Sequence, residues 1–210
     1  MTFSATSRTG AGVVTLATAL LLGGCASRGP LPTYYDFGPP ASPVAAVAPA
    51  AAPALPVLVI ADANGPSWLD NQRMYYRLLY ADAQQSRPYA YNRWNTPPLQ
   101  LLSQRLKTRI AQGGIKVLAT TDAAAGIPLL RIDVDDFSQN FDTEKQSSGQ
   151  VTLRASLFRG HVLVDQKTFS RNSRAGSADA QGGAQALASA SDAIAADLLA
   201  WLGTLTIPKE

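Results

Sequence analysis

Three consecutive stretches in the second half of the chain alternate hydrophobic and polar residues, which is the pattern of half-buried β-strands. Residues 130–141 begin with Leu-Arg-Ile-Asp-Val-Asp, residues 151–157 repeat the alternation, and residues 162–170 follow the turn Arg159-Gly160-His161. Successive side chains of a strand point to opposite faces, so one face of each strand is expected in a core and the other in water. We therefore predict a meander of three antiparallel strands, with its first turn at residues 143–149.

Two other stretches repeat their hydrophobic residues every three or four positions, as amphipathic helices do. The first follows Thr96, which can serve as N-cap with Pro97 or Pro98 in the first turn, and it runs to about Gln112, before Gly113-Gly114. The second is a long alanine-rich segment at residues 177–203. The expected buried faces are Leu99, Leu102, Leu106 and Ile110 in the first helix and Leu187, Ser191, Ile194, Leu198 and Trp201 in the second, while Gln100, Ser103, Gln104, Lys107 and Thr108 are expected on the outer face of the first.

The first half of the chain contains shorter hydrophobic and aromatic stretches, which we interpret as further strands. Leu55 to Asp62 is apolar and β-branched, as expected of a buried central strand. Met74 to Tyr80 could also be helical, but its adjacent tyrosines and the preceding turn Asn64-Gly65-Pro66 favour a strand. The remaining assignments are strands at residues 33–37 and 115–119, a polar turn at 81–87 and a short aromatic stretch at 88–94. This order of elements predicts an α+β fold, a two-layer sandwich in which a mostly antiparallel sheet packs against two main helices.

The first 24 residues have the parts of a signal peptide. One basic residue, Arg8, precedes an uncharged run from Ala11 to Leu22. A helix needs roughly 20 apolar residues to cross a bilayer, and this run has about 12, so we expect the segment to be removed rather than retained as a membrane span.

The single cysteine, Cys25, follows in the sequence Leu22-Gly23-Gly24-Cys25, which resembles the bacterial lipobox. By this resemblance, Leu22 and the two small residues are recognised by the signal peptidase, and Cys25 carries a covalent lipid whose acyl chains anchor the protein. The alternative is an incidental thiol near a cleaved leader. Ala26, in place of Asp, favours the outer membrane with the domain facing the periplasm, and inner-membrane anchoring stays open. An acylated single cysteine leaves no disulfide.

The rest of the chain is expected to be one domain on a tether. Residues 25–32 form the tether and residues 33–207 the domain, which includes an uncharged Pro/Ala-rich loop at 39–54. This composition favours extended conformers, so we interpret the loop as a spacer, with a docking site for a proline-reading partner as the less favoured alternative. The net charge of +3 comes from scattered Lys and Arg residues without a basic block, which argues against a nucleic-acid partner.

Candidate residues for catalysis or metal binding are few. The single histidine, His161, lies in a predicted turn, and the chain contains no G-x-S-x-G nucleophile motif. Asp133, Asp135 and Asp136 could suggest a cation site, but the first two fall on the solvent face of a predicted strand without an oxygen-ligand loop around them. One cysteine and one histidine cannot form a Cys/His metal cluster. We therefore predict no enzyme, no catalytic residue, no metal and no cofactor besides the lipid on Cys25.

Aromatic residues and arginine concentrate between residues 68 and 94, and these residue types dominate interface hot spots. Tyr75 and Tyr76 are neighbours in a predicted strand, so one of them is available to a partner or to lipid. We treat the region as a candidate partner interface, although about half of it can equally be core, and Arg93 with Trp94 can equally be a structural arrangement. The residues concerned are Trp68, Met74, Tyr75, Tyr76, Tyr89, Tyr91, Arg93 and Trp94.

Residues 34 to 98 carry a set of motifs that resembles the ABC-type transport auxiliary lipoproteins, the PqiC-like family that accompanies MCE-domain lipid transporters. The long Pro/Ala-rich loop and Asn95 depart from the family pattern, and the second half of the chain agrees only in the order of its elements. The motifs are Tyr34-Tyr35-x-Phe37, the strand near Val57 to Ile60, Trp68-Leu69-Asp70, Met74-Tyr75-Tyr76-Arg77 and Tyr89-Ala90-x-Asn92-Arg93-Trp94-x-x-Pro97-Pro98.

The resemblance implies a periplasmic accessory component that acts beside separate ATPase, permease and MCE-domain chains, supports lipid transport between the inner and outer membranes, and can form ring-like oligomers. The chain itself has no phosphate-binding glycine loop, in agreement with an accessory role. The alternative hypothesis is an outer-membrane structural or assembly lipoprotein that binds other envelope proteins without a transporter.

Overall fold

The structure is a computed structural model that describes residues 29–40, 55–122 and 125–206. The chain divides into two units, residues 1–31 and 32–210, and the second contains every helix and strand described below. The predicted signal peptide, Leu22, Gly23, Gly24, Cys25 and nearly all of the Pro/Ala-rich loop lie outside the described residues, so these assignments stay predictions.

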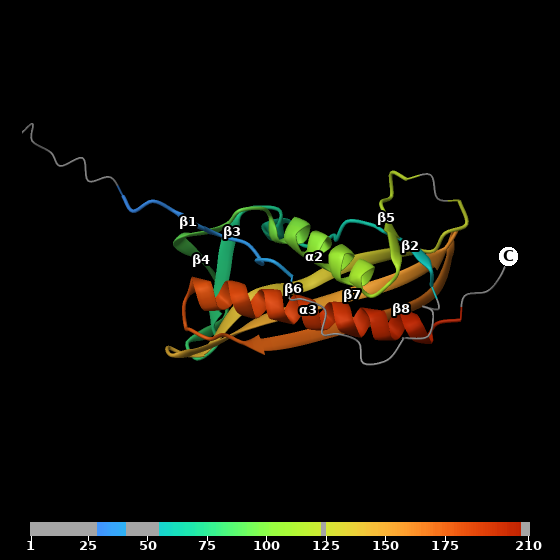
Figure 1. The fold of residues 1–210 in the computed structure, drawn as a ribbon. Helices are drawn as coiled ribbons and strands as arrows, with labels where there is room; N and C mark the ends of the chain where they lie inside the picture. Colours follow the sequence, from blue (N-terminus) through green and yellow to red (C-terminus); the bar gives the residue numbers. More distant parts are fainter. Residues whose placement is uncertain (1–28, 41–54, 123–124, 207–210) are drawn as a thin grey trace, which may run out of the picture. The chain divides into compact units, whose positions relative to one another are not determined.

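The second unit is an α+β domain in which two helices cover one face of a sheet, as predicted (Figure 1). The face that carries the helices is called the inner face below, and the opposite one the outer face. In chain order the elements are β1 (Thr33–Tyr35), β2 (Val57–Ile60), the 3-10 helix η1 (Ser67–Leu69), β3 (Arg73–Leu78), β4 (Asp82–Trp94), α2 (Pro98–Gln112), β5 (Lys116–Leu118), β6 (Leu129–Thr143), β7 (Gln146–Arg159), β8 (Val162–Arg174) and α3 (Ala180–Thr204).

Strand β6 organises the sheet because it pairs along both edges. One edge runs antiparallel to β7 over nearly its whole length, and β7 pairs antiparallel with β8, which confirms the predicted meander. The other edge is shared: β2 pairs with residues 129–130 of β6 and β3 with residues 139–141, both in parallel. Among the described strands the long ladders are therefore antiparallel, and the short pairings of β2 with β5, β2 with β6, β3 with β6 and β1 with β4 are parallel.

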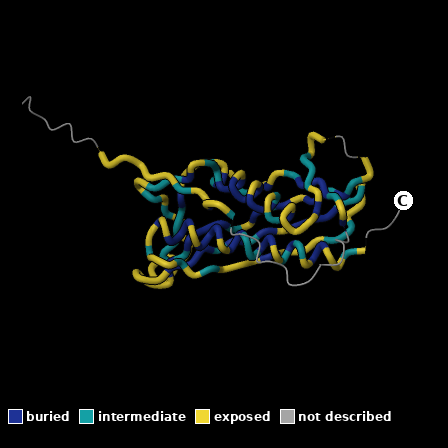
Figure 2. The backbone as a smooth tube through the Cα atoms, in the orientation of Figure 1, coloured by how far each residue is buried: buried dark blue, intermediate teal, exposed yellow. Residues whose placement is uncertain are grey.

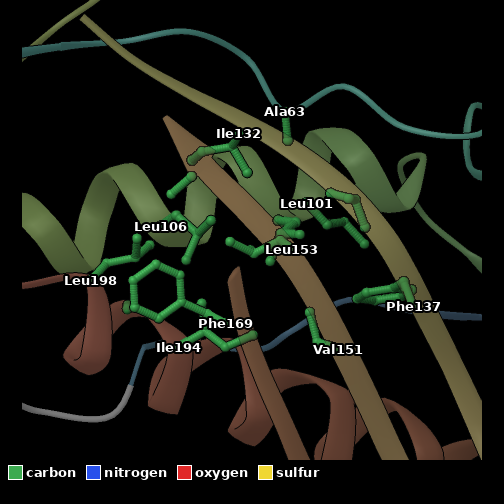
Figure 3. Packing of buried hydrophobic residues seen from close by; sticks show 14 of the residues in the cluster. Ala63, Leu101, Leu106, Ile132, Phe137, Val151, Leu153, Phe169, Ile194 and Leu198 are labelled. Carbon is green, nitrogen blue, oxygen red and sulfur yellow. The ribbon is translucent and has the colours of Figure 1, made fainter. Parts of the chain in front are cut away.

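The hydrophobic alternation predicted the buried side of this sheet correctly. Leu130, Ile132 and Val134 of β6 are buried, as are the corresponding hydrophobic residues 151, 153, 155 and 157 of β7. Figure 3 shows Ile132 and Leu153 facing Leu106 of α2 and Leu198 of α3, and Figure 2 shows the buried residues gathered between the helices and the sheet. Burial of these side chains supplies most of the driving force for folding.

Two predicted turns were wrong. The polar segment at residues 81–87 belongs to strand β4, and the turn is confined to residues 79–81. Similarly, the turn predicted at 143–149 ends before Gln146, where β7 begins. Both segments pair through their main chains while carrying Ser, Gln or Asp side chains, so neither shows the hydrophobic alternation on which the assignment relied.

The predicted faces of both helices are confirmed, with two corrections in α2. Thr96 is not the N-cap: Pro97 occupies that position, and no side chain caps the helix. Ser103, expected on the outer face, is buried because its hydroxyl accepts a bond from Ala63 N at 2.7 Å and donates one to Leu99 O at 2.7 Å. The helix ends at Gly113, and Gly114 follows with φ +93°, as the Gly-Gly pair predicted.

An ion pair joins the two helices. Arg105 of α2, only 7% exposed, donates to both carboxylate oxygens of Asp192 in α3 at 2.7 and 2.9 Å, and also to Gly38 O at 3.0 Å. The guanidinium of Arg109 adds a second contact to Asp192 at 3.1 Å. The bidentate geometry fixes α2, α3 and the segment after β1 relative to one another.

Helix α3 starts at an N-cap and lies very close to the sheet. The carboxylate of Asp179 accepts the N–H of Gly182 at 2.8 Å and the hydroxyl of Ser177 at 2.7 Å, which holds its pKa below the ordinary value. A Cβ on Gly149 of β7 would lie 2.6 Å from Leu187 N, so only glycine lets the helix approach this strand. The small alanine side chains of α3 thus allow the helix to pack closely against the sheet. Although α3 is long and apolar enough to cross a membrane, it forms part of the core.

Candidate functional site

The structure separates the candidate interface residues into two groups. Met74 and Trp94 are each 2% exposed and lie in the hydrophobic core, so a partner that docks on the folded domain cannot reach them. Their assignment to the interface was wrong, and they are core residues. Trp68, Tyr75, Tyr76, Tyr89 and Arg93 are partly exposed.

Tyr75 and Tyr76 lie on opposite faces of the sheet, as their positions in a strand required. The ring of Tyr76 packs at 4.7 Å from that of Tyr89 and at 5.6 Å from that of Phe141. The ring of Tyr75 instead makes an edge-to-face contact with Trp68, with centroids 5.6 Å apart. Of the two adjacent tyrosines, Tyr75 therefore remains for a partner, together with the exposed part of Trp68, which also packs against the core.

Tyr76 and Tyr89 belong to a buried polar arrangement centred on Gln139 of β6, which is 1% exposed. The hydroxyl of Tyr89 donates to Gln139 Oε1 at 2.9 Å. The amide nitrogen of Gln139 donates to Ser147 Oγ at 2.9 Å and to Asp179 O at 3.0 Å, at the start of α3. Burial, and next the nearby Tyr76, raise the pKa of Tyr89, so its hydroxyl stays protonated and keeps donating. These two tyrosines hold the fold together.

Arg93 has a structural role, which was one of the two interpretations of the sequence. Its guanidinium donates to the main-chain oxygens of Tyr89 at 2.6 Å, Asn92 at 2.9 Å and Ala90 at 3.1 Å. These carbonyls lie where the register between β3 and β4 shifts, so the arginine stabilises a bend in β4.

The next position, Asn95, is one at which the chain departs from the family pattern. Its N–H donates to Tyr35 O at 2.8 Å, and its side-chain amide donates to Asp36 at 3.1 Å, so it joins β4 to the segment after β1.

The accessible part of the candidate site lies on the outer face of β1, β4 and β3. Tyr34 pairs in register with Arg93, and Arg93 with Arg73, so these three residues face the same side of the sheet. Tyr34 is 56% exposed. We define the outer aromatic surface as Tyr34 and Tyr75 with the arginines Arg73 and Arg77, together with Trp68 of η1, which contacts Tyr75 and also packs partly against the core.

Sequence reasoning did not single out all of the exposed hydrophobic residues in this region. Leu79 and Tyr80, which were not included, form the tip of the β3–β4 hairpin and are 41% and 47% exposed, whereas Tyr91 of β4, which was included, is 51% exposed. Leu79 and Tyr80 were predicted as the end of the strand Met74 to Tyr80, because a hydrophobic hairpin tip has no distinguishing signal in a single sequence.

The residues considered for catalysis or metal binding do not come together. His161 is exposed in the β7–β8 turn, and Asp133 forms a loose ion pair with Arg154 at 3.6 Å. Burial raises the pKa of Asp136, whose carboxylate accepts the hydroxyl of Ser138 at 2.9 Å. Within the part of the chain that the structure describes, no group of three or more His, Cys, Asp or Glu side chains could hold a metal ion.

A hollow of about 240 Å³ lies between the segment after β1 and α2, lined by residues that include Asp36, Asn95, Gln104 and Arg105. The guanidinium of Arg105 is directed to Asp192 and Gly38, as described above, and Asp36 accepts bonds from Gly38 N and the Asn95 amide. The polar groups of this hollow therefore bond to one another, and the arrangement suits fold stability better than chemistry.

Comparison with known proteins decides the family. Residues 35–198 match the model of the ABC-type transport auxiliary lipoprotein component. The chain belongs to this family. The match spans both halves of the domain, including the second half, for which the sequence resemblance rested only on element order.

Two solved structures support the fold of this ABC-type transport auxiliary lipoprotein. A Xanthomonas campestris protein of the family DUF330 has a TM-score of 0.61 at 20% identity, over 70% of this chain and 83% of its own. An uncharacterized protein has a TM-score of 0.65 at 14% identity, over 82% of this chain and 99% of its own. A comparison with curated proteins gives no match. At these identities the structures establish the shared fold, and the family membership gives an accessory transport component of the lipoprotein class.

Proposed function

We propose that this chain is a lipid-anchored periplasmic accessory subunit of an MCE-type ABC transporter, which supports lipid transport between the inner and outer membranes and envelope integrity. The observation that carries the proposal is the family match over residues 35–198. An MCE-domain protein as direct partner, and through it the permease and ATPase, follows from the resemblance of the motifs at residues 34–98. In this role the chain contributes binding and placement, with no catalytic step of its own.

The anchor in this proposal is the lipid on Cys25, attached after signal peptidase acts on Leu22-Gly23-Gly24. Membership of a lipoprotein family supports it. Because Cys25 is the single cysteine, the substitution Cys25→Ser removes the attachment point without touching the domain. We expect this variant to lose radiolabelled palmitate and to leave the membrane fraction or accumulate as precursor. Unchanged labelling and fractionation would refute the anchor, and sucrose-gradient separation of the native protein distinguishes outer from inner membrane.

The contact with the MCE-domain partner is assigned to the outer aromatic surface. Tyr75 and Trp68 present a pair of rings in edge-to-face contact, and Arg73 and Arg77 of the same strand lie beside them. Rigid aromatic side chains next to arginine provide large contact area with few rotatable bonds, as interface hot spots require. The helices cover the inner face, so this surface is free for a second protein.

The test is co-purification of the native chain with MCE-domain proteins of the same cell envelope. Tyr75→Glu should reduce recovery of the partner at least tenfold, as expected when a charge enters a hot spot worth about 2 kcal/mol. Arg154→Ala is the matched control, since it alters the outer face of β7, away from the aromatic surface, and should leave recovery unchanged. Circular dichroism and thermal melting verify that both variants fold.

The alternative is an outer-membrane structural or assembly lipoprotein that acts without a transporter. Absence of any MCE-domain protein from the purified native complex, together with stable recovery of other envelope proteins, would establish that alternative. Homo-oligomerisation is a further prediction of the family resemblance, and light scattering of the lipid-free mature chain measures it directly.

A further inference from the structure

Strand β8 forms one edge of the sheet along its whole length. β8 spans 13 residues, whereas β1 and β5, at the other ends of the sheet, span three residues each. β7 pairs with one side of β8, and no strand within residues 29–40, 55–122 or 125–206 pairs with its other side. Alternate residues of β8 therefore direct their main-chain N–H and C=O groups away from the sheet, which is the arrangement that an extended peptide uses to add a strand.

A hollow of about 490 Å³ lies along this edge, between β8 and the last turns of α3. Its lining includes Phe169 and Trp201, whose rings make an edge-to-face contact with centroids 5.7 Å apart. The indole N–H of Trp201 donates to Asp165 at 2.8 Å, which fixes the ring against β8. A strand added to β8 would direct every second side chain towards the helix layer and hence into this hollow. Phe169 and Trp201 are each only 5% exposed, and most of the other lining residues are polar, so the hollow offers room for a side chain beside a small apolar surface.

The charge along β8 selects the kind of strand that fits. The strand carries Lys167, Arg171 and Arg174 but one acidic residue, Asp165, whose carboxylate is engaged by Trp201. Arg171 is paired with Asp197 through two bonds of 2.6 Å. The ammonium of Lys167 lies 5.5 Å from the centre of the Phe169 ring, with no carboxylate of the described chain in salt-bridge range. The edge is therefore positive and has capacity for a negative partner.

The same charges disfavour a second copy of β8 as the occupant. An antiparallel pair of β8 strands centred on Phe169 would place Lys167 of each copy opposite Arg171 of the other, and a pair centred on Thr168 would place Asp165 opposite Arg171, which is already paired with Asp197. Like charges directly opposite one another destabilise a strand pair. Cations on an edge strand also commonly protect it against uncontrolled pairing. An acidic strand is the partner that avoids both the repulsion between like charges and this protection.

We propose that β8 is a docking edge for an extended, acidic segment of a partner protein, which joins the sheet as an additional strand. Its main chain would pair with the outward N–H and C=O groups of β8. One side chain would enter the hollow beside Phe169 and Trp201, and an acidic side chain would lie beside Lys167. This contact is separate from the outer aromatic surface, which belongs to the outer face of β1, β3 and β4.

The probe is a synthetic peptide of about eight residues with alternating Glu and Val, long enough to form one strand. Residue-resolved hydrogen exchange of the mature chain is measured with and without this peptide. We expect slower exchange at alternate amides of residues 162–174, the ones that face away from β7, and no binding of a peptide with alternating Lys and Val. N-methylation of alternate amides in the Glu-Val peptide should abolish binding, because it removes the donors on one of its edges.

Charge variants complete the test. Lys167→Glu should weaken binding of the Glu-Val peptide on the order of tenfold, since a favourable pair becomes a repulsive one. Arg154→Glu makes the same change in charge on the outer face of β7 and should leave the affinity unchanged, as should Tyr75→Glu. No binding, binding without protection of β8, or equal loss in Lys167→Glu and Arg154→Glu would overturn the proposal. Protection of the same amides that depends on protein concentration in the absence of peptide would assign the edge to a second copy instead.

Discussion

Gly183 of α3 lies directly against the side-chain amide of Gln139 of β6, and the space between them has no room for a Cβ atom. The side-chain amide of Gln139 accepts a bond from the Tyr89 hydroxyl and donates one to the main-chain oxygen of Asp179. The contact therefore joins the start of α3 to β6 and β4. The close approach of helix and sheet at this point thus depends on one residue without a side chain.

The substitution Gly183→Ala should destabilise the domain by about 1–3 kcal/mol, because the added methyl forces the Gln139 amide out of its position, and this outweighs the gain in helix propensity. Urea unfolding followed by circular dichroism measures the change. Gly203→Ala is the control in the same helix: a Cβ there meets no atom within 4 Å, so stability should rise by up to about 1 kcal/mol. Equal effects of the two substitutions would contradict the packing described.

Removing the Tyr89 hydroxyl tests the buried hydrogen bonds of Gln139. In Tyr89→Phe the ring and its contact with Tyr76 persist, but Gln139 Oε1 loses its donor at 2.9 Å inside the protein. We expect a loss of about 1–2 kcal/mol in the free energy of unfolding. Tyr91→Phe removes a hydroxyl from a ring that is 51% exposed and should be neutral, so a comparable loss there would point to a general effect of tyrosine hydroxyls.

The ion pair between the helices should be worth far more than the exposed pair at the sheet edge. Asp192→Asn leaves the guanidinium of Arg105, 7% exposed, without its counter-charge, and we expect a loss of about 2–4 kcal/mol. Asp197→Asn weakens the pair with Arg171, whose side chains are 50% and 28% exposed, and should cost less than about 1 kcal/mol. Thermal unfolding of the two variants compares them directly, and similar losses would mean that the pair between α2 and α3 is open to solvent.

Two aspartates should affect the acid stability in opposite directions. The bonds from Gly182 N–H and the Ser177 hydroxyl lower the pKa of Asp179 in the folded state, so its stabilisation is present above the unfolded pKa near 3.8 and is lost as the pH falls through the folded value. Burial raises the pKa of Asp136, so its ionisation on going to neutral pH opposes folding.

We therefore expect Asp179→Ala to lose about 1 kcal/mol at pH 7, the usual value of an N-cap, and progressively less below pH 4. Asp136→Asn should retain the bond from Ser138 while removing the buried charge, and it should be neutral or up to about 1 kcal/mol more stable at pH 7, with a smaller difference in acid. Unfolding free energies between pH 3 and 7 provide the measurement. A destabilised Asp136→Asn variant would mean that the bond from Ser138 and the positive charge of Arg77, which both favour the ionised carboxylate, outweigh the cost of burying it.

Prediction from sequence succeeded where burial imposes a period on the chain. The alternation at Leu130, Ile132 and Val134 and the three-to-four spacing at Leu102, Leu106 and Ile110 both located buried faces correctly. The pattern failed where main-chain pairing alone holds a strand, as at the start of β4, and where a polar residue is buried with a distant partner. Ser103 bonds to Ala63, 40 residues away, and Gln139 to Asp179, also 40 residues away, and no local signal encodes such pairs.

The candidate interface was predicted in part for the same reason. The concentration of aromatic residues between Trp68 and Trp94 correctly marked a region of ring contacts, and the adjacent tyrosines correctly indicated two faces. Composition cannot distinguish a ring that completes a core, such as Trp94, from one that faces solvent, such as Tyr34. That distinction depends on which face the helices cover, and hence on the tertiary fold.

The shared edge of β6 also determines the order in which the domain can be completed. As the chain is synthesised from its N-terminus, β2 and β3 appear roughly 70 residues before the strand with which both pair, and until then β3 has only the hairpin with β4. Contacts between such distant segments form late and slowly. Truncations that end before Leu129 should therefore fail to fold. Until the meander has formed, the hydrophobic strand at Val57–Ile60 can pair only with the short strand β5, so the first half of this protein depends on its second half for protection from aggregation.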